Sequence, residues 1–118
     1  MKGNIGYVEL HTPDLDKSKR FYAELFDWRL EDLKTPGGDY SLFHTGGSVE
    51  GGMLKDATPM WLSYITVEQL ESAVTRAKAL GARVLREKTE VPDNGWFTVL
   101  SDPAGAPFAL WQNMTPRG

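Results

Sequence analysis

Two segments of the chain alternate hydrophobic and polar residues with the period of a β-strand. Residues 5–11 read Ile-Gly-Tyr-Val-Glu-Leu-His, and residues 60–67 read Met-Trp-Leu-Ser-Tyr-Ile-Thr-Val. Successive side chains of a strand point to opposite faces of a sheet, so each segment presents two different surfaces. We therefore predict a strand at each segment, with one face toward a core and the other available for other contacts.

Each predicted strand is followed by a stretch in which apolar residues recur at helical spacing. Such a pattern predicts an amphipathic helix with one face on a core. The first stripe consists of Leu15, Phe21, Tyr22, Leu25 and Phe26. The second consists of Leu70, Ala73, Val74, Ala77 and Leu80. Gly81 then stands where a glycine commonly ends a helix, and either Thr12 or Asp14 can cap the first helix.

The two halves of the chain repeat this order. Sliding the first half by about 55 residues places Leu15 on Leu70 and Leu25 on Leu80. In both halves two further strand-like runs follow, separated by turn signals such as Gly46-Gly47. The sequence therefore predicts an α+β fold of two βαβββ modules, about 4–56 and 59–114, in one domain that covers residues 1–118.

The first predicted strand divides its side chains sharply between its faces. Val8 and Leu10 form an aliphatic face that we expect beneath the helices. The opposite face carries an aromatic ring, a carboxylate and an imidazole, namely Tyr7, Glu9 and His11. The repeat adds equivalent positions from the later strands: Leu62, Tyr64, Thr66, Ala109 and Trp111. A face this rich in aromatic residues predicts a ligand-binding groove rather than an ordinary wet surface.

Composition removes several classes of function. The chain has 118 residues, a formal net charge of −3 and no cysteine, which excludes disulfides, thiolate metal sites and a cysteine nucleophile. Its basic residues form no block, so nucleic acid is not an expected partner. No apolar run is long enough to span a membrane, and the first residues lack the pattern of a secretory signal, which predicts a cytoplasmic protein.

Several short motifs occur in a characteristic order along the whole chain. They are Asp14-Leu15-Asp16-Lys17-Ser18, Arg20-Phe21-Tyr22, Leu25-Phe26-Asp27-Trp28, Ala79-Leu80-Gly81-Ala82, and Asp102-Pro103-Ala104-Gly105 before Phe108-Ala109-Leu110-Trp111. With these motifs the chain resembles the vicinal oxygen chelate superfamily of glyoxalase I, bleomycin-resistance proteins and extradiol dioxygenases. It is most similar to the single-domain proteins related to lactoylglutathione lyase. The resemblance implies a mixed sheet curved into a cup, helices on its outer face, and a homodimer.

The resemblance also implies where a divalent metal would bind. The four ligand positions of the superfamily fall on Tyr7, Leu62, Ala109 and, from the repeat, Gly51, with Glu50 as the result of a one-residue slip. Leucine, alanine and glycine side chains offer no donor atom, so we expect no metal and no other cofactor. A displaced site could draw on Glu9, His11, His44 and Glu50, although His44 and Glu50 read more simply as surface residues beside a turn.

The predicted function is binding of a small, partly apolar or aromatic organic molecule in the cup. The predicted contacts are Tyr7, Glu9, His11, Leu62, Tyr64 and Trp111. One alternative is a metal-free isomerase or lyase in which Glu9 transfers a proton and Tyr7 or His11 polarises a substrate oxygen. The others are a metal-dependent lyase or dioxygenase built on Glu9 and His11, and a subunit whose role is to pair with another protein. If Glu9 is instead structural, a basic residue such as Arg83 or Arg86 is its expected partner.

Overall fold

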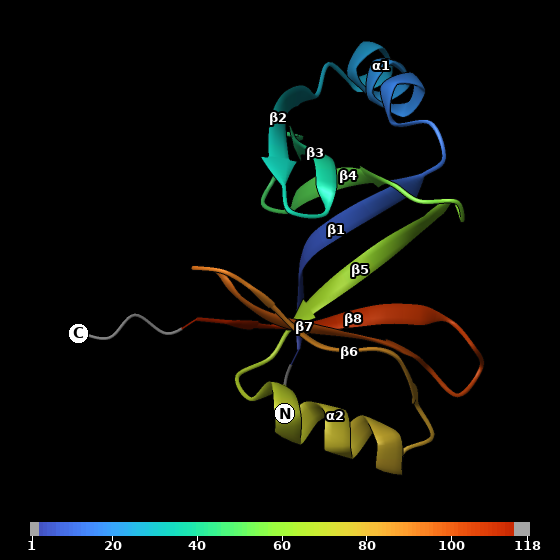
Figure 1. Ribbon diagram of the computed structural model, residues 1–118, viewed down its shortest axis with the longest axis vertical. Coiled ribbons are helices and arrows are strands. Elements are labelled where there is room, and N and C mark those ends of the chain that lie inside the picture. The colour runs from blue at the N-terminus through green and yellow to red at the C-terminus, as the bar shows by residue number, and fades with distance from the viewer. Residues whose placement is uncertain (1–2, 115–118) are drawn as a thin grey trace. The chain divides into compact units, whose positions relative to one another are not determined.

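The computed structural model describes residues 3–114, and the order of its elements is that of two βαβββ modules (Figure 1). The first module consists of β1 (Asn4–Thr12), α1 (Leu15–Phe26), β2 (Arg29–Thr35), β3 (Gly38–His44) and β4 (Glu50–Lys55). The second consists of β5 (Met60–Thr66), α2 (Leu70–Ala79), β6 (Arg83–Val91), β7 (Gly95–Ser101) and β8 (Pro107–Asn113). The predicted α+β class and its repeat are confirmed. Neither helix of the described residues has the length and apolar character needed to cross a membrane.

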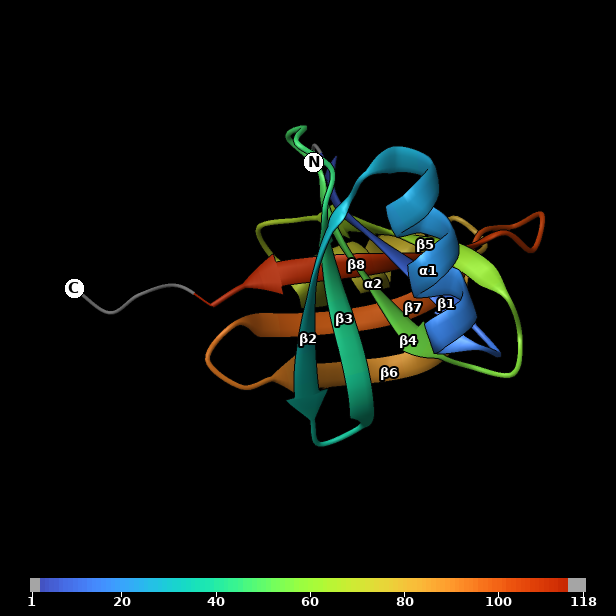
Figure 2. The same ribbon diagram turned by 90° about the horizontal axis from the view of Figure 1, so that it is seen from above.

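The chain divides into two compact units, each with a mixed four-stranded sheet. The N-terminal unit is Gly6–Leu62, and the C-terminal unit is Ser63–Gly118 together with Met1–Ile5. In the N-terminal unit the strand order is β2-β3-β4-β1, and only β1 and β4 are parallel. In the C-terminal unit the order is β6-β7-β8-β5, and only β5 and β8 are parallel. Figure 2 shows β6, β7 and β8 as neighbouring strands.

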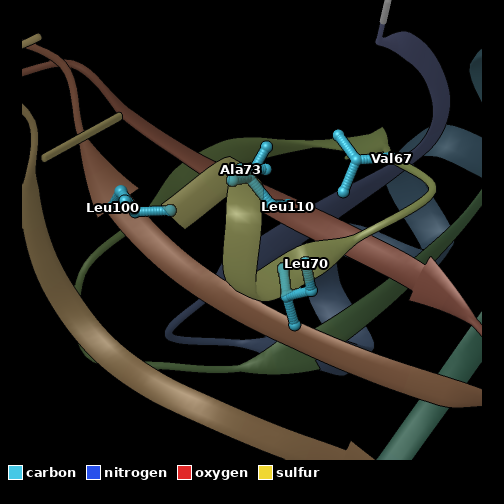
Figure 3. Packing of buried hydrophobic residues seen from close by; sticks show 5 residues of the cluster. All are labelled: Val67, Leu70, Ala73, Leu100 and Leu110. Atoms are coloured by element: carbon cyan, nitrogen blue, oxygen red, sulfur yellow. The ribbon is translucent and has the colours of Figure 1, made fainter. Parts of the chain in front are cut away.

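The core of the C-terminal unit lies between α2 and its sheet. Its buried residues are Val67, Leu70, Ala73, Leu100 and Leu110 (Figure 3). The predicted stripe of α2 is buried at its first positions, but Leu80 at its C-terminal end is 63% exposed. Gly81 follows with a φ of +106°, a conformation that glycine adopts without strain, so the predicted end of the helix is confirmed. At the other end, the backbone N–H of Leu70 donates to the side-chain oxygen of Gln112 at 2.7 Å.

The N-terminal unit has a smaller core, and α1 covers it only in part. Leu10, Phe43 and Met53 are buried, and Leu15 and Tyr22 of α1 pack against them. Asp14 caps the helix by accepting a hydrogen bond from the Lys17 N–H at 3.1 Å. The other three residues of the predicted α1 stripe are more than half exposed: Phe21, Leu25 and Phe26. The stripe is therefore wider than the core beneath it.

Two adjacent glycines of β4 make room for aromatic rings on opposite faces of the sheet. Gly51 pairs with Val8 and Gly52 pairs with Glu9 in the parallel ladder. A side-chain carbon on Gly51 would overlap the ring of Phe43 and lie 2.7 Å from the carbonyl oxygen of Val8. Gly51 thus lies on the helix side of the sheet together with Val8. The repeat had assigned a metal-ligand position on the Glu9 face to Gly51, but the residue at that position is Gly52. The offset between the two modules is not constant, because β6 has 9 residues and β2 has 7, and this blurs the register expected for β4.

Replacing Gly51 by alanine should lower the free energy of unfolding by about 1–3 kcal/mol, the usual effect of overpacking a core. The physical reason is the overlap of the added methyl group with Phe43 and with the β1 backbone. Gly47→Ala is the matched control, because the nearest atom to its added carbon is Thr45 Oγ1 at 3.5 Å. Urea unfolding of both variants checks the prediction, and equal midpoints for the two would contradict it.

Candidate functional site

The register of the N-terminal sheet places the three polar residues of β1 on one face. Tyr7 pairs with Glu50, Glu9 with Gly52 and His11 with Leu54. Paired residues of a parallel ladder share a face, so this face is the one opposite Val8 and Leu10. The predicted grouping of Tyr7, Glu9 and His11 on a common face is therefore correct.

Five side chains of this face form a continuous series of hydrogen bonds, which we call the Glu9 network. Glu9 Oε1 lies 2.8 Å from His11 Nε2, and His11 Nδ1 lies 2.9 Å from Asp56 Oδ2. The hydroxyl of Tyr40 donates to Glu9 Oε2 at 2.8 Å. The hydroxyls of Tyr7 and Tyr40 are 2.5 Å apart. The network therefore runs from Tyr7 through Tyr40, Glu9 and His11 to Asp56.

Tyr40 and Asp56 are members of the network that the sequence analysis did not identify. Tyr40 is on β3 and reaches Glu9 on β1 by crossing over β4. The crossing depends on Gly52, because a side-chain carbon there would overlap the Tyr40 hydroxyl. Glycine inside a strand often marks such a close approach, and this was the available signal. Asp56 follows β4 in a loop, and nothing in its sequence context distinguishes it.

The electrostatics of the network favour a charged imidazole. The hydrogen bond to Glu9 is the main cause that raises the pKa of His11, and the bond to Asp56 raises it further against the opposing effect of burial. The same imidazole lowers the pKa of Asp56, helped by backbone N–H groups near Thr58. A protonated His11 donates from both ring nitrogens, one to each carboxylate. Glu9 itself is only 7% exposed, and His11 pairs with its carboxylate.

Both tyrosines of the network stay protonated at neutral pH. Burial raises the pKa of Tyr7 to about 12, with a smaller contribution from the charge of Glu9. Burial and the nearby Glu9 also raise the pKa of Tyr40 well above its usual value. The network can therefore hold a proton on His11 and offer carboxylate oxygens and phenolic hydroxyls as hydrogen-bonding groups. These are the means to orient a polar group of a ligand or to relay a proton.

A second histidine of the same sheet also lies between two carboxylates. His44 Nδ1 is 3.1 Å from Glu50 Oε2, and His44 Nε2 is 3.5 Å from Glu31 Oε1. The side chains of Glu31 and Glu50 are 52% and 60% exposed, so water screens their interaction with His44. Glu50 is thus a solvated carboxylate, as expected, whereas the side chain of His44 is 23% exposed and lies partly buried in the sheet.

The donor atoms of residues 3–114 do not converge on a point where a metal ion could bind. No group of three or more histidine, aspartate or glutamate side chains in this part of the chain has the required arrangement. In the Glu9 network both nitrogens of His11 are already directed at carboxylates on opposite sides of the ring. The divalent metal implied by the superfamily resemblance therefore does not fit the residues present.

The C-terminal unit has its own aromatic face. Tyr64 pairs with Ala109 and Thr66 pairs with Trp111, so these residues share a face as predicted. Leu62 precedes Tyr64 by two positions on β5 and is 1% exposed. The Trp111 indole N–H donates to Asn113 Oδ1 at 2.8 Å. Tyr64 and Trp111 belong to this unit, whereas the Glu9 network lies within the N-terminal unit.

Two residues of the aromatic face were absent from the sequence prediction. The ring of Phe97 lies 5.9 Å from that of Tyr64, and the guanidinium carbon of Arg86 lies 5.1 Å from the centre of the Phe97 ring. Phe97 is on β7 and Arg86 on β6, strands for which the resemblance implied no ligand position. The alternation of Phe97 with the core residues Trp96 and Thr98 was the signal that could have placed it.

Comparison with known proteins gives relatives along nearly the whole chain. The chain is 30% identical over 120 residues to CFP32 of Mycobacterium tuberculosis, whose name describes it as a putative glyoxylase, and the match covers 94% of this chain and 46% of that protein. It is 26% identical over 135 residues to the anthracycline biosynthesis protein DnrV of Streptomyces peucetius, with 98% and 49% covered. The chain thus spans about half the length of these curated relatives.

Solved structures share the fold at low sequence identity. Methylmalonyl-CoA epimerase from Mycobacterium tuberculosis matches with a TM-score of 0.70 at 14% identity, over 93% of this chain and 87% of that one. The protein BH1468 from Bacillus halodurans matches with a TM-score of 0.75 at 12% identity, over 100% and 99%. A model of the glyoxalase-like domain matches residues 7–111. Since this match includes both modules, the chain belongs to the glyoxalase-like family of the vicinal oxygen chelate superfamily.

Proposed function

We propose that this chain binds a small, partly apolar or aromatic organic molecule without a metal, and that the Glu9 network orients a polar group of that molecule. The observation that carries the proposal is the buried carboxylate of Glu9, held by hydrogen bonds from Tyr40 and His11. Polar groups fixed in this way on a sheet face are typical of sites that select a ligand by its hydrogen bonds. Tyr7, Glu9 and His11 are the proposed polar contacts.

The strands β5 and β8 offer a separate set of apolar contacts to a molecule of this kind. Leu62, Tyr64 and Trp111 are the residues concerned, and aromatic side chains give large contact areas to planar ligands. The loss of the chelate supports a role without a metal, because Leu62, Ala109 and Gly52 have no donor atoms at the corresponding positions. Relatives that are named for glyoxylase activity or for anthracycline biosynthesis make a small organic ligand a reasonable expectation.

A second candidate function is a metal-free isomerase or lyase that uses Glu9 as the acid and base. The observation that favours it is the unbroken hydrogen-bond series from Tyr7 to the partly exposed Asp56, which can pass a proton between Glu9 and solvent. In such a reaction Glu9 takes a proton from carbon, and the Tyr7 hydroxyl turns from Tyr40 to donate a hydrogen bond to the substrate oxygen. Exchange of a carbon-bound hydrogen with deuterated water distinguishes this function from binding alone.

We also propose that the chain forms a homodimer and that it is located in the cytoplasm. The support is an apolar surface on the N-terminal unit. It is formed by four side chains whose exposed fractions lie between 45% and 57%, namely Phe21, Leu25, Phe26 and Trp61. Tyr22 connects these side chains to the core through ring contacts with Phe21, Phe26 and Trp61. A contiguous exposed apolar patch is a common feature of interfaces between subunits.

Glu9→Gln should weaken binding of 2-naphthol, a neutral aromatic alcohol, by about tenfold, because a hydrogen bond to a charged group is worth roughly 1.5–3 kcal/mol. Asp56→Asn is the matched control, since it removes the other carboxylate on His11 without changing the proposed contact. Each variant removes one of the two carboxylates that pair with His11, so both are expected to lose stability. The affinity for 2-naphthol, and not the stability, therefore distinguishes Glu9→Gln from its control. Calorimetry on protein dialysed against EDTA checks this, and equal affinities for the two variants would falsify it.

The stability that His11 contributes should depend on pH with a definite sign. The folded-state pKa of His11 is raised, so its stabilisation is fully present below the unfolded value near 6.5 and is lost as pH rises through the folded value. The difference in unfolding free energy between the wild type and His11→Gln should therefore shrink between pH 6 and pH 9. Denaturant titrations at several pH values measure it. A difference that grows with pH would show that His11 is neutral in the fold.

The proposed dimer predicts that light scattering at micromolar concentration gives about twice the monomer mass of 13.2 kDa. Phe26→Lys together with Leu25→Lys should shift the mass to that of the monomer, because charges replace apolar side chains at the proposed interface. The matched control places lysine at Leu80 and Leu85, which are also more than half exposed but lie in the C-terminal unit. A wild-type mass near that of the monomer counts against the dimer.

A further inference from the structure

We propose that the ligand carries a carboxylate and that Arg86 binds it beside the rings of Phe97 and Tyr64. This inference rests on the proposed binding function and adds the class of ligand, a planar aromatic acid. Its basis is a row of three side chains from β6, β7 and β5. The guanidinium of Arg86 lies 5.1 Å from the centre of the Phe97 ring, and that ring lies 5.9 Å from the ring of Tyr64.

The register explains why these side chains meet. Arg86 pairs with Val99, and Val99 pairs with Ala109, which in turn pairs with Tyr64. All four therefore share the face opposite α2. Ala109 is fully buried and small, so the rings of Tyr64 and Phe97, from strands on either side of β8, can approach each other. A larger residue at Ala109 would occupy the space between the strands.

No carboxylate within residues 3–114 pairs with Arg86, whereas a neighbouring lysine has such a partner. Lys88, on the same strand, lies 5.4 Å from the centre of the Trp96 ring and forms an ion pair with Glu71 at 3.1 Å. Among residues 3–114, no carboxylate forms an ion pair with Arg86 or Arg83. The ladder pairs of β6 with β7 place Arg83, Arg86 and Thr89 on the aromatic face, and none of these residues is acidic.

The chemistry of a stacked arginine selects a particular ligand. A guanidinium that lies over a ring keeps its N–H groups directed outward, where they can donate in pairs to the two oxygens of a carboxylate. The flanking rings of Phe97 and Tyr64 favour a planar apolar body attached to that carboxylate. The Glu9 network is a poor alternative for the anion, because its two carboxylates outnumber its one imidazolium. The arrangement therefore fits an aromatic acid better than a neutral or cationic aromatic compound.

The test compares 2-naphthoate with 2-naphthol, which have the same ring system and differ in the charged group. Calorimetry is done on the full-length protein at pH 7.5. We expect the wild type to bind 2-naphthoate more tightly than 2-naphthol. Arg86→Gln should weaken 2-naphthoate binding by about tenfold, the size expected for a charged hydrogen bond, and should change 2-naphthol binding by less than about twofold. Arg86→Lys, which retains the charge but not the paired N–H groups, should recover only part of the loss.

Lys88→Gln is the matched control, because it removes the same charge from the same strand but from the side of Trp96 and Glu71. It should leave both affinities within about twofold of the wild type. Equal losses of 2-naphthoate affinity in the Arg86→Gln and Lys88→Gln variants would overturn the inference, because the net charge of the protein would then explain the effect. Binding of 2-naphthol with no preference for 2-naphthoate would overturn the inference and leave the proposed function standing. If the wild type binds neither compound, the proposed function fails as well.

Discussion

The buried carboxylate of Glu9 sets the arrangement of the N-terminal sheet face. An unpaired charge inside a protein is unfavourable by several kcal/mol, so a carboxylate in mid-strand requires partners within reach. His11 supplies one on the same strand, two residues further on, and Tyr40 supplies another from β3. Tyr40 in turn depends on the missing side chain of Gly52, and the orientation of His11 depends on Asp56. A single charged residue thus accounts for four others.

The two units use the same structural device for different chemistry. In each unit a small residue lies on the last strand of the module, which pairs in parallel with the first strand. This residue lets a side chain from the neighbouring antiparallel strand reach across toward the first strand. Gly52 does this for Tyr40 and Ala109 does it for Phe97. The result is a network of ionisable groups in one unit and, in the other, an aromatic face with an arginine over the ring of Phe97. The repeated fold therefore carries two different sets of binding groups.

The same small residues carry no donor atom that could bind a metal ion. At Gly52 the space that a side chain would fill is occupied by the ring and hydroxyl of Tyr40. A carboxylate or imidazole side chain at position 52 would therefore clash with Tyr40. The absence of a side chain at Gly52 and the hydrogen bond from Tyr40 to Glu9 are thus linked.

The sequence alone determined the fold and the division of each strand into two faces. Hydrophobic periodicity is local, so it was enough to predict both helices, the repeat of the βαβββ module, and the shared face of Tyr7, Glu9 and His11. Only the tertiary structure decided the register of β4, the partners of Glu9, and the positions of Tyr40, Asp56, Phe97 and Arg86. These features depend on contacts between residues distant in sequence, such as Tyr40 and Glu9, which are 31 positions apart. Their energies arise from cross-strand distances and from burial, and neither leaves a periodic trace in the order of the residues.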